Sequence, residues 1–438
     1  MKKISISWAP NAQKDDIVLA LSLLFRPWKW FGNKAVEHLE KKVGDFLDTK
    51  AYAFDSARSS LYAILKAFGI GKGDEVLLQA FTCVALPNPI LWVGAKPIYV
   101  DIDLDNFNID VDDLEKKITL KTKAVIVQYT FGIVPNLSRI KDICSKHNLI
   151  LIEDNCHNFG QVFQVDGKRY KAGTFGDAAM ISLGQEKIIS ATRGGFAVVH
   201  NKRARIPLED EYEYLKKPRI RDIIRGILNP CIWKVREKFG FIGDLIYKFL
   251  VKIRLHELGL TKEELTGKKA NHLPYSMPNS NAILGLKQFG KLEKFIQHRK
   301  RVASNYFKVL SNYITVQQDN NMKVSILSNE DARKPVRGIK IVKRNEASRY
   351  APPTWLRFPI VMEDAENVRR DAETKGIILG NWYTEVIHCQ GVDMCALNYK
   401  EGSCPKAEWL VQRSINLPTH QGIGTDEIRK ILEFIMQY

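Results

Sequence analysis

Four polar features of the sequence have the residue types and the spacing that cofactor chemistry requires. Lys187 follows an apolar run and precedes Gly194-Gly195, so its amine is either a solvated charge or a nucleophile that can attach to an aldehyde. Asp154 ends the apolar run LILIE, where a carboxylate can bind a metal, hold a ribose, pair with a charged ring nitrogen or cap a turn. Ser182 lies five residues before Lys187, and its hydroxyl either donates to a phosphate or belongs to an ordinary turn.

The fourth feature is the tetrapeptide Ser56-Ala57-Arg58-Ser59, which lies between a short apolar run and an amphipathic segment. Small residues let a backbone approach an anion, and the first turn of a helix supplies free N–H groups and a positive dipole. Arg58 would add a charge-assisted contact. The tetrapeptide lacks the lysine pattern of a nucleotide-binding P-loop, but it could hold a phosphate.

Together these features match the needs of pyridoxal phosphate. Its phosphate needs N–H and hydroxyl donors, its ring nitrogen needs a carboxylate that keeps it protonated, and its aldehyde needs an amine. A metal is not expected, because Glu153 should point to the opposite face of the strand from Asp154, and the seven cysteines lack the spacing of metal ligands.

The elements that must position these residues form an alternating pattern. Strands are predicted in GDEVLLQ, KPIYVDID, KTKAVIVQ, LILIED, AAMISL and GGFAVVH, with the helix LSRIKDICSKHN between the third and the fourth. Alternation of this kind favours an α/β fold with a mainly parallel sheet flanked by helices. We therefore expect Asp154 at the carboxyl edge of that sheet, where ligands bind.

The sequence resembles the DegT/StrS-type sugar aminotransferases. The resemblance rests on GDEV, the Gly-Ala-Lys-Pro before VDID, KTKA, HNLILIEDN and the Ser-x4-Lys with a following Gly-Gly, and it returns at residues 282–310 and 415–420. It implies a fold type I pyridoxal-phosphate-dependent transferase with a smaller C-terminal α+β domain. It also implies an enzyme that moves an amino group from an amino acid, with glutamate as the expected donor, to a nucleotide-linked keto sugar in cell-surface glycan or related biosynthesis.

The resemblance also assigns residues of this sequence to the cofactor. Lys187 would attach to the cofactor and move the proton, and Asp154 would hold the ring nitrogen. His157 would contact the oxygen-bearing side of the ring, with a helix-cap or core histidine as the alternative. The phosphate would be held by Ser56, Ala57, Arg58 and Ser182.

Three positions depart from the family's pattern. Arg58 stands where a threonine is common, and Cys83 stands where an aromatic residue stacks on the ring, so that either Cys83 or Phe81 would take that place. Tyr129 stands where a histidine is usual. These departures affect the substrate side more than the transfer chemistry.

Four further residues are candidates for substrate contacts. Asn271, His272 and Tyr275 lie in a segment that, in the family, reaches the cofactor of the partner subunit, which implies a homodimer with composite sites. Arg357 could clamp a carboxylate or phosphate, and a surface arginine on a strand is the alternative.

Two other functions stay open at this point. One is an enzyme of the same family that acts on a non-sugar ketone or as a dehydratase, although Lys187 argues against the dehydratases that carry histidine there. The other is a non-catalytic sensory or binding protein with this fold, against which Lys187 and Asp154 both argue.

Charge and domain organisation complete the expectations. The net charge of +17 favours anionic ligands, but no nucleic-acid-binding motif is present, so nucleic acid is not an expected partner. We expect an N-terminal segment (1–50), a cofactor-binding α/β domain (51–202), a basic amphipathic helical insert (203–270) and a long helix with a small domain (271–438). Scattered cysteines and the polar N-terminus indicate the cytoplasm. The insert either covers the active site or dimer interface or contacts the inner face of the membrane.

Overall fold

The computed structural model describes residues 3–6, 9–253, 255–256, 259–311, 340–341 and 352–438. A seven-stranded sheet forms its centre, in the order β2-β13-β12-β9-β8-β3-β5. The bounds of these strands are Ala51–Phe54 (β2), Gly195–Val199 (β13), Ala178–Ser182 (β12), Ile150–Asp154 (β9), Thr122–Gln128 (β8), Glu75–Gln79 (β3) and Lys96–Val100 (β5). The predicted mainly parallel sheet is confirmed, and β13 runs antiparallel to both of its neighbours.

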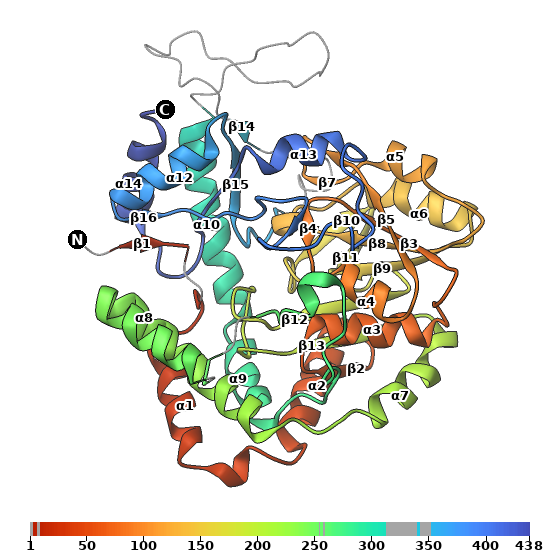
Figure 1. Cartoon of the computed structure of the whole chain (residues 1–438), viewed down its shortest axis with the longest axis horizontal. Helices are drawn as coiled ribbons and strands as arrows, with labels where there is room; N and C mark the ends of the chain where they lie inside the picture. Colours follow the sequence, from red (N-terminus) through yellow and green to blue (C-terminus); the bar gives the residue numbers. More distant parts are fainter. Residues whose placement is uncertain (1–2, 7–8, 254, 257–258, 312–339, 342–351) are drawn as a thin grey trace.

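Helices cover both faces of the sheet, as Figure 1 shows. On one face, Val76, Ile126 and Ile152 share a core with α3, whereas on the other Leu77 and Leu151 pack with α5 and α6. Alternate residues of each strand point to opposite faces of the sheet and meet different helices. The residues on both faces must therefore be apolar, which explains the uninterrupted apolar runs. The helices around the sheet are α2 (Lys34–Leu47), α3 (Ala57–Ala67), α4 (Pro87–Trp92), α5 (Val111–Lys116), α6 (Leu137–Lys146), α7 (Arg205–Glu213) and α9 (Asn279–Phe289).

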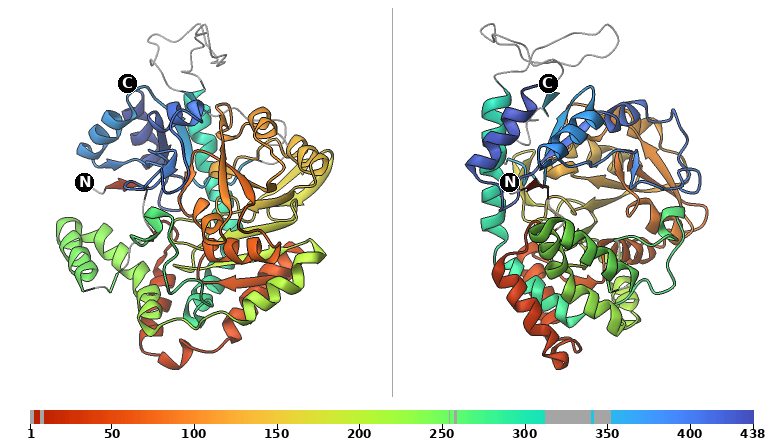
Figure 2. Two further views of the ribbon diagram at one scale, coloured as in Figure 1. Left: turned by 45° about the vertical axis from the view of Figure 1, so that its right-hand side comes forward. Right: turned by 60° about the vertical axis from the view of Figure 1, so that its left-hand side comes forward.

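A smaller α+β part follows the long helix α10 (Leu292–Leu310), as Figure 2 shows. Its strands β14 (Lys340–Ile341), β15 (Phe358–Val361) and β18 (Ser414–Leu417) form an antiparallel sheet. Two strand pairs tie it to the rest of the chain: β1 (Ile4–Ser5) with β16 (Ile377–Ile378), and β4 (Thr82–Cys83) with β17 (Ile387–His388). Its helices are α12 (Ala365–Thr374), α13 (Pro405–Val411) and α14 (Thr425–Ile435).

Two short hairpins and a pair of long helices complete the described fold. The hairpins are β6 (Ile102–Asp103) with β7 (Asn108–Ile109), and β10 (Val162–Val165) with β11 (Lys168–Lys171). The helix α8 (Ile220–Lys252) packs against α1 (Lys14–Leu24), and their shared core includes Leu23, Ile223 and Ile227. Among the described helices, none combines the length and the apolarity that a bilayer crossing needs.

The helix α8 is bent at Gly240, where the backbone leaves helical geometry at φ 51° and ψ −119°. Pro230 also lies inside α8, but it does not interrupt the helix. A proline inside a helix removes one backbone hydrogen bond and crowds the preceding turn, at a cost of about 3 kcal/mol. We attribute the continuity at Pro230 to the burial of Ile227, Ile232 and Trp233 on either side of it.

Candidate active site

The carboxyl ends of two neighbouring strands place an acid and a hydroxyl at the same edge of the sheet. Asp154 is the last residue of β9 and lies opposite Met180 of the parallel strand β12. Ser182, the last residue of β12, therefore extends just beyond Asp154 along the same direction. This arrangement is the one that the sequence predicted for a ligand site.

The carboxylate of Asp154 is buried, and its Oδ1 accepts a hydrogen bond of 3.0 Å from the backbone N–H of Cys156. Burial raises the pKa of Asp154, while the hydrogen bonds from Cys156 and the charge of Lys187 act in the opposite direction. A cation set against this carboxylate would offset the cost of its burial. A protonated ring nitrogen is such a cation, so Asp154 fits pyridoxal phosphate.

Lys187 lies in the turn after β12, and its Nζ is 4.8 Å from the centre of the Trp382 ring. The charge of Lys187, whose side chain is half-buried, influences the pKa of several buried or half-buried side chains: Cys83, Asp154, Cys156, His157 and Glu186. The amine therefore acts electrostatically on Asp154, as the cofactor requires.

A pair of glycines brings the start of α3 to the same place. Gly194 forms a bridge with Ser56 and accepts a hydrogen bond from the backbone N–H of Leu183, next to Ser182. A Cβ added at Gly195 would lie 2.4 Å from the backbone nitrogen of Ala57, so only glycine permits this approach. The first N–H groups of α3 and the hydroxyl of Ser182 are thus neighbours, which suits a phosphate.

Substitution of Gly195 by alanine tests this close approach. We expect the affinity for pyridoxal phosphate to fall by about tenfold or more, because the added methyl group pushes the start of α3 away from Ser182. Equilibrium titration of the apoprotein with cofactor measures the effect. Gly259→Ala is the matched control, since a Cβ there meets no atom within 4 Å. Equal cofactor affinity in both variants would contradict the proposed phosphate cradle, which consists of Ser182 and the first N–H groups of α3.

The side chain of Arg58 has a different partner from the expected phosphate. Its Nε lies 2.7 Å from a carboxylate oxygen of Glu264, and it donates a 2.9 Å hydrogen bond to the carbonyl of Gly259. Glu264 is fully buried, and a buried carboxylate requires a cationic partner. The backbone N–H of Arg58 remains in the first turn of α3, so only the side-chain part of the prediction needs correction.

His157 lies in a layer of aromatic rings beside Lys187. Its ring stacks on Trp382 at 5.3 Å, and its Nδ1 accepts a 3.2 Å hydrogen bond from the backbone N–H of Phe131. Burial, followed by the charges of Lys187 and Arg357, holds the pKa of His157 well below its usual value. The imidazole is therefore neutral at physiological pH, and its Nε2–H can donate to an oxygen of the cofactor ring.

Arg357 lies in the interior, which corrects the alternative of a surface arginine. Its guanidinium forms an ion pair with Glu186 and lies 3.6 Å from the centre of the Trp382 ring. Burial raises the pKa of Glu186, and the charges of Arg357 and Lys187 oppose that rise. Trp382 thus contacts Arg357, Lys187 and His157, although sequence analysis had not selected it or Glu186. The position of Glu186, next to Lys187, was a signal that could have been used.

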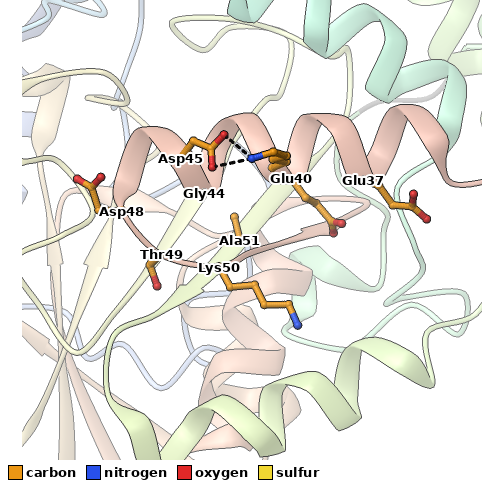
Figure 3. Close-up of a pocket in the computed structure, with 9 residues that line it drawn as sticks. Glu37, Glu40, Gly44, Asp45, Asp48, Thr49, Lys50 and Ala51 are labelled. Atoms are coloured by element: carbon orange, nitrogen blue, oxygen red, sulfur yellow. Dashed lines mark hydrogen bonds and ion pairs between the residues drawn. The ribbon is translucent and has the colours of Figure 1, made fainter.

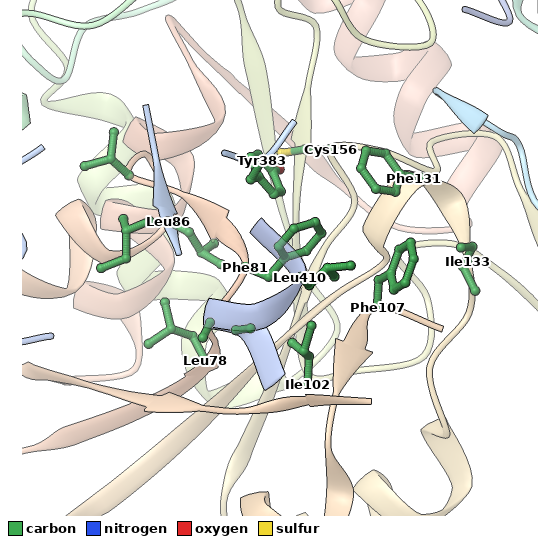
Figure 4. Packing of buried hydrophobic residues seen from close by; sticks show 14 of the residues in the cluster. Leu78, Phe81, Leu86, Ile102, Phe107, Phe131, Ile133, Cys156, Tyr383 and Leu410 are labelled. Atoms are coloured by element: carbon green, nitrogen blue, oxygen red, sulfur yellow. The ribbon is translucent and has the colours of Figure 1, made fainter. Parts of the chain in front are cut away.

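The two candidates for stacking on the cofactor ring occupy different environments. Phe81 is fully buried and packs edge-on against Phe107, Phe131 and Tyr383, deep in the cluster of Figure 4. Cys83 lies nearer the charged groups, because Lys187, Arg58 and Asp154 all influence its pKa, which burial raises. The structure therefore places Cys83 at the site and Phe81 in the core behind it.

Tyr129 lies on the wrong face of the sheet for a substrate contact. Its hydroxyl donates a 2.6 Å hydrogen bond to Glu153, and both side chains are fully buried. Tyr129 belongs to the core shared with α5 and α6, opposite the face that carries Asp154. The prediction for Tyr129 is corrected accordingly, and its role is to hold Glu153.

The segment around Tyr275 packs on its own chain at the start of α3. The backbone N–H of Asp55 donates a 3.0 Å hydrogen bond to the carbonyl of Tyr275, and the carboxylate of Asp55 accepts one of 3.1 Å from the backbone N–H of Tyr275. The ring of His272 lies 6.2 Å from that of Tyr275, and the carbonyl of Asn271 accepts from Lys216. These residues therefore lie beside the cradle of the same subunit.

Other features of the described residues do not compete with this site. No group of His, Cys, Asp and Glu in the described part of the chain could hold a metal ion. A separate hollow between α2 and β2, shown in Figure 3, is lined by Glu37, Glu40, Lys41, Gly44, Asp45, Asp48, Thr49, Lys50 and Ala51. None of these residues belongs to the site around Lys187.

The fold and the site define a pyridoxal-phosphate-dependent transferase of fold type I. A sequence model of the DegT/DnrJ/EryC1/StrS aminotransferase family matches residues 13–208 and 245–436, and the chain belongs to this family. It is therefore an aminotransferase whose cofactor is pyridoxal phosphate.

Known relatives agree with this assignment. GDP-perosamine synthase of Escherichia coli O157:H7 is 33% identical over 413 residues, which cover 93% of this chain and 92% of the relative. The UDP-2-acetamido-2-deoxy-3-oxo-D-glucuronate aminotransferase of Pseudomonas aeruginosa is 32% identical over 197 residues, 41% of this chain and 54% of the relative. The crystal structure of NtdA from Bacillus subtilis, with the cofactor PMP bound, is 19% identical and has a TM-score of 0.70, covering 100% of this chain and 85% of that one.

Proposed function

We propose that this aminotransferase moves an amino group from an amino acid, with glutamate as the donor, to a keto sugar carried on a nucleotide. The observation that carries the proposal is that Asp154, Ser182 and the start of α3 meet at one edge of the sheet, where the charge of Lys187 acts on Asp154. The names of the two relatives describe a GDP-linked and a UDP-linked sugar, and this supports a nucleotide-linked substrate. The product would serve cell-surface glycan or related biosynthesis.

When bound, pyridoxal phosphate supplies an electron sink that stabilises negative charge on the substrate carbon. Lys187 would hold the cofactor through its amine, and the same amine would move the proton to and from the substrate carbon. Asp154 keeps the ring nitrogen charged, and the neutral His157 donates to the ring oxygen. Ser182 and the first N–H groups of α3 hold the phosphate.

The substrate side of the site is assigned to Trp382 and Arg357. Trp382 lies against the amine of Lys187, and the buried guanidinium of Arg357 contacts the same ring. A buried arginine can take a carboxylate in a bidentate contact. We therefore assign Arg357 to the carboxylate of the amino donor, with Glu186 as its partner when the donor is absent.

Substitution of Arg357 by glutamine tests this assignment. We expect the KM for glutamate to rise about a hundredfold, because a charge-assisted bidentate contact is lost. The KM for the keto-sugar substrate, measured in the same steady-state series, should change much less. The double variant Arg357→Gln/Glu186→Gln is the control, since it leaves no buried carboxylate unpaired. An unchanged KM for glutamate in both variants would exclude Arg357 from donor binding.

Three further parts of the proposal concern assembly and location. We assign a homodimer, with Asn271, His272 and Tyr275 near the subunit boundary, as the family resemblance implies. We assign the cytoplasm, which the free thiols of all seven cysteines, each among the described residues, support. We also assign a peripheral membrane contact to the insert of residues 203–270.

A spectral titration tests the proposed reaction. The cofactor-loaded protein should absorb at about 410 nm, lose that band when glutamate is added, and regain it when a suitable nucleotide-linked keto sugar follows. A panel of GDP-, UDP- and TDP-linked keto sugars, with free keto acids as the comparison, identifies the acceptor class. If glutamate leaves the band unchanged, or if only non-sugar ketones restore it, the proposed function is wrong.

A further inference from the structure

The outer side of the second half of α8 is an exposed apolar stripe with no described partner surface. Its members are Ile242, Leu245, Ile246, Phe249 and Ile253, each at least 40% exposed. Their spacing of three and four residues places them on one side of the helix after the bend at Gly240. An apolar side of this kind normally faces a core, so its exposure needs an explanation.

The inner side of the same segment is fixed against the first half of α8. A Cβ added at Gly243 would lie 2.7 Å from the Cα of Arg236, so the backbones of the two halves approach each other closely. The rings of Trp233 and Tyr247 contact each other at 5.0 Å, and the guanidinium of Arg236 lies over both, at 5.2 and 4.4 Å from their centres, and pairs with Asp244. These contacts settle which side faces inward, and they leave the apolar stripe on the outside.

The charges around the stripe are positive. Lys238, Lys248 and Lys252 are exposed, whereas the acidic residues Glu237 and Asp244 are each paired with a basic neighbour. An apolar stripe with lysines beside it complements an anionic lipid surface, where the apolar side chains enter the headgroup region and the lysines meet the phosphates. A symmetric contact between two copies would instead bring the same lysines together.

The family match treats the two halves of α8 differently. It ends at residue 208 and resumes at 245, so the first half of α8 and the bend lie outside it. Figures 1 and 2 show α8 at the margin of the molecule, away from the central sheet. From Leu245 onward the stripe lies within the matched residues, and only Ile242 lies outside them.

We propose that the second half of α8 binds the surface of an anionic phospholipid bilayer, with residues 242–253 lying in the interface. This inference rests on the proposed function, which assigns the aminotransferase a peripheral membrane contact. It names the residues that make that contact and the lipids that they bind. The bound helix would lie along the surface, and the enzyme would work beside the membrane.

Vesicle flotation of the full-length, cofactor-loaded protein tests the proposal. The protein should float with vesicles of phosphatidylcholine and phosphatidylglycerol, not with phosphatidylcholine alone, and high salt should weaken the binding. The variant Ile246→Asp/Phe249→Asp should bind about a hundredfold more weakly, since two large apolar side chains no longer enter the interface. Lys248→Glu/Lys252→Glu should lose the preference for anionic vesicles.

Matched controls separate this result from misfolding and from the proposed function. Leu120→Asp/Ile206→Asp adds the same charges at two other exposed apolar residues and should bind vesicles like the unmodified protein. Every variant should keep amino transfer in vesicle-free buffer, so failure of flotation and failure of catalysis are distinguishable. Equal flotation of the Ile246→Asp/Phe249→Asp variant, or no flotation of the unmodified protein, overturns the proposal. Conversion of a dimer to a monomer by that variant would show that the stripe joins two copies, and would also overturn it.

Discussion

Replacing Lys187 by alanine is expected to lower the rate of amino transfer by about 10⁴-fold or more, because one side chain both attaches to the cofactor and moves the proton. The variant should also lose the absorbance at about 410 nm that reports the attachment. Steady-state rates with glutamate and a keto sugar, together with absorbance spectra, measure both effects.

The control for this variant is Lys168→Ala, which removes an exposed lysine from the hairpin strand β11. It should keep the rate and the spectrum of the unmodified protein. The loss in Lys187→Ala should appear in kcat, because the protein still binds its substrates. A variant that retains turnover would exclude Lys187 as the group that attaches to the cofactor.

The second prediction compares substitutions of two adjacent acids, Asp154 and Glu153. Asp154→Asn should lower kcat about 10³-fold while leaving the protein folded, because an amide cannot keep the ring nitrogen of the cofactor charged. Glu153→Gln should have the opposite effect: it should leave kcat nearly unchanged and destabilise the protein. Glu153 accepts hydrogen bonds from Tyr129 and from the backbone N–H groups of Gly173, Phe175 and Gly176, so the free energy of unfolding should fall by about 3 kcal/mol.

Chemical denaturation and steady-state kinetics of the two variants separate these roles. The pair is informative because the two acids are neighbours in sequence and differ only in the face of β9 from which they project. If Asp154→Asn kept full activity, or if Glu153→Gln lost activity without losing stability, the assignment of the two faces would be wrong.

The strand pattern and the placement of Asp154, Ser182 and Lys187 at the ends of strands could be predicted from the sequence because their signals are local. Apolar runs gave the buried parallel strands, and the Ser182 to Lys187 spacing lies within one strand and its turn. Asp154 was predictable because a parallel sheet brings the carboxyl ends of its strands to one edge.

The remaining parts of the site depend on packing between distant segments. Arg357 and Trp382 reach Lys187 from the C-terminal part of the chain, and no local pattern in their surroundings indicates that contact. The side chain of Arg58 was assigned to the phosphate because Glu264 lies about two hundred residues away in sequence and could not be paired with it beforehand. Tyr129 follows β8, where a difference of one residue decides which face a side chain takes.

The insert illustrates the same limit. Its helical character followed from amphipathic spacing, yet spacing alone could not show which side of α8 would be covered. The contacts of Arg236 with Trp233 and Tyr247 decide that side, because they fix the second half of the helix against the first. The apolar stripe then faces outward as a consequence.

The central claim is that the amine of Lys187 and the carboxylate of Asp154 act on one pyridoxal phosphate. The most direct measurement is reduction of the cofactor-loaded protein with borohydride, followed by peptide mapping with mass spectrometry. We expect a single stable modification on Lys187, and the Asp154→Asn variant should carry it on the same residue. Modification of a different lysine, or none in a protein that retains its cofactor, would contradict the claim.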